Sequence, residues 1–235
     1  MAQSATVIAA LKFSDGVLIA ADSQASDLAA QVRWPVGKVV RIGQHPLVVG
    51  FGGSMGMGDR AKKAIADLGL RPTTFKKCEL IQAAIDRALE PIYEAIQTNN
   101  KPPAPNVWAI GLTGLAVFWA GDAAHILERE INGDSCFHNC FHAIGSGSQT
   151  AYAVYRTLGG RRLVEVDERR ALMALLRVLR TSVDVEVFGV SEPFSAFVVT
   201  AKGVHQLIQD ELQPHLQAVG EWESDEQERF FAQRV

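Results

Sequence analysis

The feature of the sequence that most restricts its fold is a pair of short apolar segments near the start, at residues 7–11 and 17–21. Ser14-Asp15-Gly16 lies between them. Both segments are rich in β-branched or small apolar residues, and an Asp-Gly pair between two such segments is a strong signal for a β-hairpin. Nearly every position is apolar, whereas a strand with one wet face would alternate. The sequence therefore predicts a hairpin in a sheet that is covered on both faces.

Further apolar patterns place strands and helices along the chain in blocks. Strands are predicted at residues 36–42, 47–51, 107–112, 115–120, 126–130, 136–144, 194–200 and 204–208, with a hairpin turn at Thr113-Gly114. Helices are predicted at residues 61–68, over about 25 residues after Thr73 or Thr74, and at residues 149–158 and 168–183. This blockwise order excludes a simple alternating parallel α/β fold. It predicts an α+β protein with antiparallel sheets between helix layers.

Composition excludes several classes of function. The net charge is −3, and the lysines and arginines are dispersed, so nothing points to a nucleic acid as a partner. No apolar run approaches the roughly 18 residues that a membrane span needs, and the first residues lack the pattern of a signal peptide. Three cysteines, an odd number, favour free thiols in a reducing compartment. The sequence thus predicts a cytoplasmic protein of one domain, with no membrane contact.

Polar residues and a glycine pair stand at the ends of the first predicted strands. Thr6 precedes the first strand, Asp22 follows the second, Lys38 lies in the next segment, and Gly52-Gly53 follows the fourth strand. Such a set could supply a nucleophile, a carboxylate, an ammonium group and free backbone N–H donors. A threonine at a strand start and a surface salt bridge are the ordinary structural alternatives.

These residues occur in a recognisable order. T-V-I-A-A, then G-V-L-I-A-A-D-S-Q-A, K-V-V-R-I and G-F-G-G resemble the start of a proteasome β-type subunit of the bacterial HslV type, in the N-terminal-nucleophile hydrolase superfamily. The similarity runs without a gap from Thr6 to about Ser54, resumes at residues 143–148 and is weaker around Asp184. It implies a four-layer αββα sandwich of two antiparallel sheets between helix layers.

The resemblance also implies roles for three of these residues. Thr6 is expected to be the nucleophile, with its own α-amine as the base once the preceding peptide bond has been cut. Lys38 is expected to stabilise the alkoxide, and Asp22 to pair with Lys38, because a buried lysine without a partner is costly.

Three further positions complete the expected site. Gly52 matches the backbone donor that stabilises the tetrahedral oxyanion. Ser146, in the turn Gly-Ser-Gly-Ser, is expected to bind the free amine; its structural role would be to cap the helix that follows, and both roles can hold at once. Asp184 is chosen as a second carboxylate near the amine, on a poor local match, since Val187 stands where the family often has serine.

The resemblance divides the chain into three parts. Residues 1–5 are expected to be a short propeptide, residues 6–212 the proteasome-type domain, and residues 213–235 an acidic tail that either docks on a neighbour or frays. Ala5 stands where self-cleaving members usually have glycine, and Ser4 is the alternative terminal nucleophile, although it breaks the gapless spacing.

The expected substrate pocket is small and apolar. By position it is lined by Ala25, Val36, Val40, Gly50 and Ser54, which favours a moderately sized hydrophobic side chain at the cleaved residue. No cofactor or metal is expected: Cys136, His138, Cys140 and His142 alternate along a single predicted strand, too far apart to bind one tetrahedral zinc.

The sequence therefore predicts a threonine-type peptidase subunit that cleaves peptide bonds of peptides or unfolded proteins. The resemblance implies a homo-oligomeric ring or double ring and, often, an ATP-dependent unfoldase as partner. Two alternatives stay open: a catalytically silent ring or scaffold subunit that keeps its leader, and an amidohydrolase of the same nucleophile class that acts on other amides.

Overall fold

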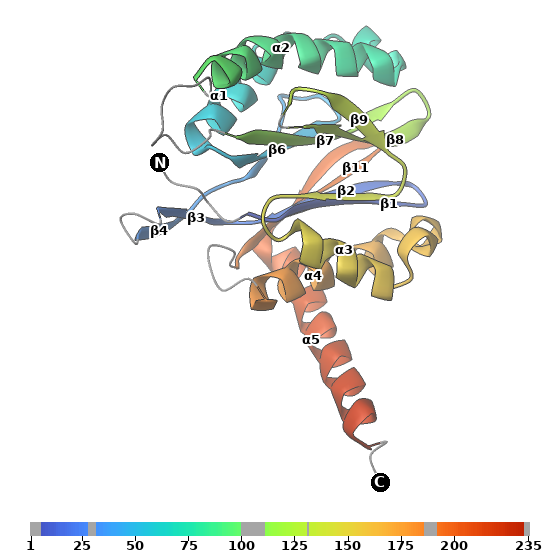
Figure 1. Ribbon diagram of the computed structural model, residues 1–235. Helices are drawn as coiled ribbons and strands as arrows, with labels where there is room; N and C mark the ends of the chain where they lie inside the picture. The colour runs from blue at the N-terminus through green and yellow to red at the C-terminus, as the bar shows by residue number, and fades with distance from the viewer. Residues whose placement is uncertain (1–5, 28–31, 100–110, 131, 186–191, 233–235) are drawn as a thin grey trace.

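Two antiparallel sheets of five strands each lie face to face between two layers of helices (Figure 1). The computed structural model describes residues 6–27, 32–99, 111–130, 132–185 and 192–232. The expected propeptide, residues 1–5 with Ser4 and Ala5, lies outside the described residues. The four layers confirm the predicted αββα sandwich.

The first sheet is built around the hairpin at the start of the chain. Its order is β10-β1-β2-β11-β12, with β1 at Ile8–Phe13, β2 at Gly16–Asp22, β10 at Phe141–Ile144, β11 at Phe194–Thr200 and β12 at Gly203–Leu207. Phe13 pairs with Gly16 across the predicted Asp-Gly turn. All of β2 is buried, as an apolar run without alternation predicts.

The second sheet has the order β5-β6-β7-β8-β9. Its strands are β5 at Val39–Arg41, β6 at Leu47–Gly53, β7 at Leu112–Ala120, β8 at Ala123–Arg129 and β9 at Ser135–His138. A short hairpin outside both sheets, β3 at Gln24–Asp27 and β4 at Val32–Pro35, was not predicted.

Helices cover the outer face of each sheet. The helices α1 (Met55–Ala66), η1 (Pro72–Lys76) and α2 (Cys78–Asn99) lie over the second sheet, and α3 (Ser148–Thr157), η2 (Gly160–Glu165) and α4 (Glu168–Val185) lie over the first (Figure 1). Apolar side chains form a core in each of the three spaces between layers, and the space between the two sheets holds Ile8, Ile19, Val48, Val117 and Ile126. Within the described residues, no helix is long and apolar enough to cross a membrane.

The predicted turn at Thr113-Gly114 is wrong, because both residues lie inside β7. A Cβ atom at position 114 would lie 2.6 Å from Cε1 of Phe51, so the glycine makes room for an aromatic ring on the neighbouring strand β6. The turn occurs instead after β7, where Gly121 has a φ of +63°. Most of the predicted strand at residues 107–112 lies outside the described residues.

The predicted strand at residues 136–144 is also wrong as a single element. Its first half is β9 in the second sheet, and its second half is β10 in the first sheet, so the chain passes from one sheet to the other at Asn139-Cys140. The predicted spacing of His138 and His142 along one strand is therefore wrong. The two residues lie on different strands, and their ring centroids are 3.6 Å apart.

The C-terminal segment is a helix, α5 (Gln209–Ala232), that projects beyond the layers (Figure 1). Leu212, Leu216 and Val219 are buried in the core that α4 shares with the first sheet. Farther along, the guanidinium group of Arg177 lies 4.1 Å from the ring centroid of Trp222 and pairs with Glu226. The predicted fraying is therefore wrong for Gln209–Ala232, whereas docking on a neighbour stays a prediction.

Burial of α5 leads to a stability prediction. Leu212→Ala should lower the free energy of unfolding by about 2–5 kcal/mol, because it removes methyl groups from a fully buried position. The matched control is Leu80→Ala on α2, whose side chain is 48% exposed and which should change stability by less than about 0.5 kcal/mol. Urea unfolding of both variants makes the comparison, and equal midpoints would mean that α5 does not pack as described.

Candidate active site

Thr6 lies directly before β1 and is only 1% exposed. Its backbone N–H donates to Oγ of Ser146 at 3.1 Å, and its carbonyl oxygen accepts from the N–H of Gly147 at 3.2 Å. Ser146 thus reaches the nitrogen that it was predicted to bind. Helix α3 has Gly147 at its N-cap with no side-chain cap, so the alternative capping role of Ser146 is not observed.

The turn around Ser146 depends on a glycine that sequence reasoning did not single out. Gly145 has a φ of +95°, and a Cβ atom at this position would lie 2.0 Å from the carbonyl oxygen of Thr6. Only glycine has both this backbone conformation and the space that Thr6 needs. In the sequence, the two glycines of Gly-Ser-Gly were the signal that could have predicted this tight turn.

Asp22, at the end of β2, is fully buried and connects three groups. Its Oδ1 accepts a hydrogen bond from the N–H of Val7 at 2.9 Å, and both carboxylate oxygens lie 2.7 Å from Nζ of Lys38. The N–H of Asp22 in turn donates to the carbonyl oxygen of Val7 at 3.2 Å. Asp22 therefore fixes Lys38 beside the residue that follows Thr6.

Lys38 precedes β5 of the opposite sheet and is 4% exposed. Burial lowers its pKa below the ordinary lysine value, and the charge of Asp22 opposes that change. The predicted pair is consequently a buried one, and the alternative of a surface salt bridge is wrong. An ammonium group in this environment interacts more strongly with a developing negative charge than one in water.

Gly52 of β6 faces Thr6 across the two sheets. A Cβ atom at position 52 would lie 3.6 Å from Cγ2 of Thr6 and 3.9 Å from Cα of Gly145. A larger residue would thus fill the space beside the threonine. The structure brings Thr6, Asp22, Lys38, Gly52 and Ser146 together at one end of the sandwich.

Asp184 is exposed, whereas Thr6, Asp22 and Lys38 are buried. It lies near the end of α4. The residue of α4 that approaches the turn is Ser182, which is fully buried. A Cβ atom added at Gly147 would lie 3.5 Å from the Cβ atom of Ser182. Ser182 uses its hydroxyl to donate to the carbonyl oxygen of Val178.

The predicted pocket residues are only partly assembled. Val36 and Ser54 line a shallow pocket that also includes Lys38, Phe51 and Met55. The other predicted residues are not among its lining residues: Val40 is partly exposed, Gly50 is buried against Val39 and Ile8, and Ala25 pairs with Trp34 in the β3–β4 hairpin. Phe51 and Met55 add larger apolar side chains than the prediction contained, and Lys38, Asp59 and Lys62 add charged groups to the lining.

Comparison with known proteins agrees with this architecture. The family model described as "Proteasome subunit" matches residues 2–189. Among solved structures, Anbu (ancestral beta-subunit) from Yersinia bercovieri superposes with a TM-score of 0.76 at 11% identity, covering 97% of each chain. An Anbu (Gly-1) mutant from Hyphomicrobium sp. strain MC1 gives a TM-score of 0.74 at 11% identity, covering 98% of this chain and 97% of that one. No curated protein matches the sequence.

Burial of the Asp22–Lys38 pair predicts a large effect on stability. Lys38→Ala should lower the free energy of unfolding by about 3–5 kcal/mol, because Asp22 would stay buried without its cation. The matched control, Arg170→Ala, removes an exposed cation whose Nε lies 3.8 Å from a carboxylate oxygen of Asp167, and it should cost about 0–1 kcal/mol. Chemical unfolding compares the two variants, and a similar small loss in both would contradict a buried ion pair.

Proposed function

The chain belongs to the proteasome subunit family, and from this premise we propose that it is a threonine-type hydrolase that cleaves peptide bonds with Thr6 as its N-terminal nucleophile. The observation that carries the proposal is the set of contacts around Thr6. Its nitrogen is bound to Ser146, and the adjacent peptide is bound to the buried Asp22–Lys38 pair. A threonine that only started a strand would not need a buried ammonium group beside it.

The proposed mechanism begins with the α-amine of Thr6. A free α-amine has a pKa near 8, so about neutral pH a fraction is unprotonated and can take the proton of the threonine hydroxyl. The Oγ1 atom then attacks the substrate carbonyl carbon, and the C=O bond becomes a C–O⁻ single bond. The positive charge of Lys38 stabilises the hydroxyl oxygen as it loses its proton.

The remaining steps complete the cycle. The N–H of Gly52 is proposed to donate to the oxyanion, whose collapse expels the leaving amine with the proton held by the α-amine. An ester between Thr6 and the substrate acyl group remains. Water, deprotonated by the same amine, attacks this ester, releases the acid product and returns the proton to Oγ1.

This chemistry requires that the peptide bond before Thr6 is cut. In the uncleaved chain the nitrogen of Thr6 is an amide, which has no lone pair available as a base. We therefore propose that residues 1–5 are removed, and that Ser146 then accepts from the amine that it already contacts as an amide.

The pocket beside Lys38 supports a preference for a hydrophobic side chain in the substrate. Val36, Phe51 and Met55 contribute apolar surface and Ser54 contributes one hydroxyl. Lys38, Asp59 and Lys62 contribute charged groups to the same lining. We propose that this pocket, rather than the full predicted set with Ala25, Val40 and Gly50, selects the residue before the cleaved bond.

The assembly and partners follow from the family. We propose a homo-oligomeric ring or double ring that encloses the sites, with unfolded protein as substrate and an ATP-dependent unfoldase as a possible supplier. The free cysteines Cys78, Cys136 and Cys140 support a reducing, cytoplasmic location.

The first test combines mass and activity. Protein that hydrolyses a fluorogenic peptide with a hydrophobic residue before the cleaved bond should lack residues 1–5 by intact-mass analysis. Thr6→Ala should abolish turnover and leave the oligomer intact by light scattering, because only a hydroxyl and a methyl group are affected. The matched control, Thr157→Ala at the exposed end of α3, should keep full activity.

Three results would contradict this assignment in different ways. Active protein that retains its leader would exclude an N-terminal amine as the base. Mature protein without turnover of peptides or small amides would indicate a silent subunit. Turnover of small amides alone would indicate an amidohydrolase that does not act on peptides.

Lys38 gives a second kinetic test. Lys38→Ala should lower kcat/KM by at least ~100-fold, comparable to removal of a single oxyanion donor, because the charge acts in a buried site. The rate is measured on variant protein that has first been shown to be folded by circular dichroism. Near-normal turnover by this variant would exclude the proposed role of the lysine.

A further inference from the structure

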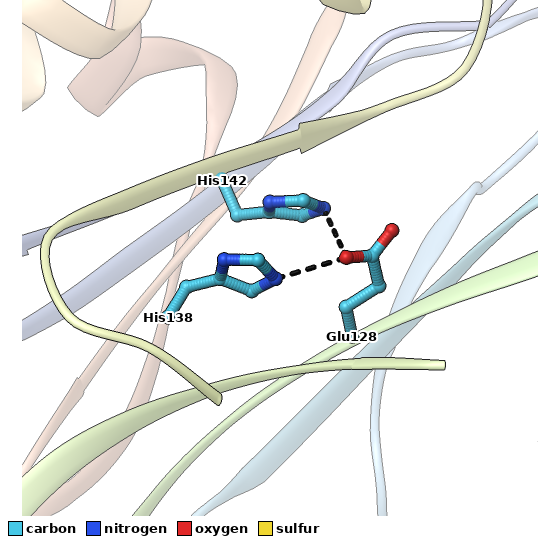
Figure 2. A group of neighbouring side chains, drawn as sticks. All are labelled: Glu128, His138 and His142. Carbon is cyan, nitrogen blue, oxygen red and sulfur yellow. Dashed lines mark hydrogen bonds and ion pairs between the residues drawn. The ribbon is translucent and has the colours of Figure 1, made fainter. Parts of the chain in front are cut away.

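Three side chains that the proposed mechanism does not use converge at the crossing between the sheets. Glu128 of β8, His138 of β9 and His142 of β10 point toward one another (Figure 2). The Nε2 atoms of both histidines lie 2.9 Å from the same carboxylate oxygen, Oε2 of Glu128. One donor atom from each of the three residues lies within 4.8 Å of the others.

Strand geometry places this group inside the sandwich. In β8 and β9, Ile126 pairs with His138, and Glu128 lies on the same strand face as Ile126, two residues on. In β10, His142 pairs with Ala10 of β1. Because Ile126 and Ala10 belong to the core between the sheets, all three side chains enter that space at its edge.

Hydrogen bonding within the group leaves one nitrogen unexplained. Nε2 of His138 forms a hydrogen bond with Glu128. Nε2 of His142 is buried and equally near, but its geometry is not that of a hydrogen bond, and it has no other partner among the described residues. His142 as a whole is only 7% exposed, so this nitrogen is a buried polar atom aimed at a carboxylate. Such an atom is costly unless a proton or a cation lies between the two groups.

The surroundings orient His142 in the way that a metal ligand requires. Its other ring nitrogen, Nδ1, lies 2.7 Å from Oη of Tyr152. If Nδ1 carries the proton and donates to the tyrosine, Nε2 presents its lone pair to the centre of the group. Histidines that bind metals typically use their second nitrogen in this way.

Glu128 supplies the oxygen donor of the group. Its Oε2 atom lies 2.9 Å from Nε2 of both histidines, and its side chain is 15% exposed. Two imidazoles and one carboxylate form a set that binds Zn²⁺ in many proteins, with a fourth position left for water.

We propose that Glu128, His138 and His142 bind a divalent transition-metal ion, Zn²⁺ in the first instance. Zinc–ligand distances of ~2.1 Å in a tetrahedral site place the donor atoms ~3.4 Å apart, so a separation of 2.9 Å needs only a small movement of the side chains. His138 lies in the wall of an open surface cavity with Cys140 and Tyr152, which provides a route for the ion.

The ion would join the two sheets directly. Glu128 and His138 belong to the second sheet and His142 to the first, and apolar side chains fill the space between these sheets. In the sequence, Glu128 and His138 precede β10 and His142 lies within it, whereas the Gly145-Ser146 turn follows it. The inference is independent of the proposed function, because none of its ligands has a part in the mechanism.

The direct test is metal content of the full-length protein. Protein stripped with EDTA is incubated with Zn²⁺, desalted and assayed for zinc by mass spectrometry, and one ion per chain is expected. Replacement by Co²⁺ should give the visible absorption of a four-coordinate site with nitrogen and oxygen ligands. Wild-type protein that leaves the desalting column without metal would overturn the proposal, whatever the variants show.

Variants locate the ion. Glu128→Gln, which preserves volume, and His142→Ala should each weaken zinc affinity at least ~100-fold, and Tyr152→Phe should weaken it ~10–100-fold by removing the partner of Nδ1. The matched control is His205→Gln, which removes an exposed histidine 3.0 Å from Glu211 and should leave zinc binding unchanged.

If the three residues have only a structural role, a different result is expected. If the three residues only form a hydrogen-bonded group, zinc should not raise the melting temperature of wild-type protein more than that of Glu128→Gln. Zinc that remains bound with unchanged affinity in folded Glu128→Gln or His138→Asn would place the ion elsewhere and overturn the proposal. If His142→Ala does not fold, these two variants still decide the question.

Discussion

The arrangement around Thr6 depends on the buried ion pair between Asp22 and Lys38. Two opposite charges removed from water are costly unless they are close and their remaining hydrogen-bonding capacity is used. Here both carboxylate oxygens contact the ammonium group, and one of them also accepts from the N–H of Val7. Asp22 ends a strand of the first sheet, and Lys38 precedes a strand of the second, so the pair is closed off from water only when the two sheets pack together.

Much of the fold could be predicted from local apolar patterns. The hairpins β1–β2 and β11–β12 and the helices α3 and α4 follow directly from the period of buried residues and from turn residues. The errors arose where one residue type has two uses. Gly114 is a turn signal in sequence, but in the structure it leaves room for the ring of Phe51. Residues 136–144 alternate like one strand, but alternation does not reveal that the chain changes sheets at Asn139-Cys140.

The candidate site could be predicted to the extent that its residues lie in contiguous motifs. Thr6, Asp22, Lys38, Gly52 and Ser146 come together because each stands at the end of a strand, and these ends meet at one side of the sandwich. Asp184 was chosen from a weak local match. Whether a residue of α4 faces the core or the solvent depends on its position around the helix, which this match could not predict, and Asp184 is exposed. Glu128 was missed because its partnership with His138 and His142 exists only after the sheets have stacked.

The crossing at Asn139-Cys140 has a mechanical consequence for the proposed active site. Thr6, Asp22 and Ser146 are carried by the first sheet and its connections, whereas Lys38 and Gly52 are carried by the second. The alignment of the proposed catalytic groups therefore depends on how far the two sheets slide past each other, rather than on the stiffness of either sheet. A slip of ~1 Å can cost about 100-fold in rate. The chain crossing and the contact between Glu128 and His142 connect the two sheets at one edge. The Asp22–Lys38 pair connects them at a second place, so sliding of one sheet past the other is opposed at both.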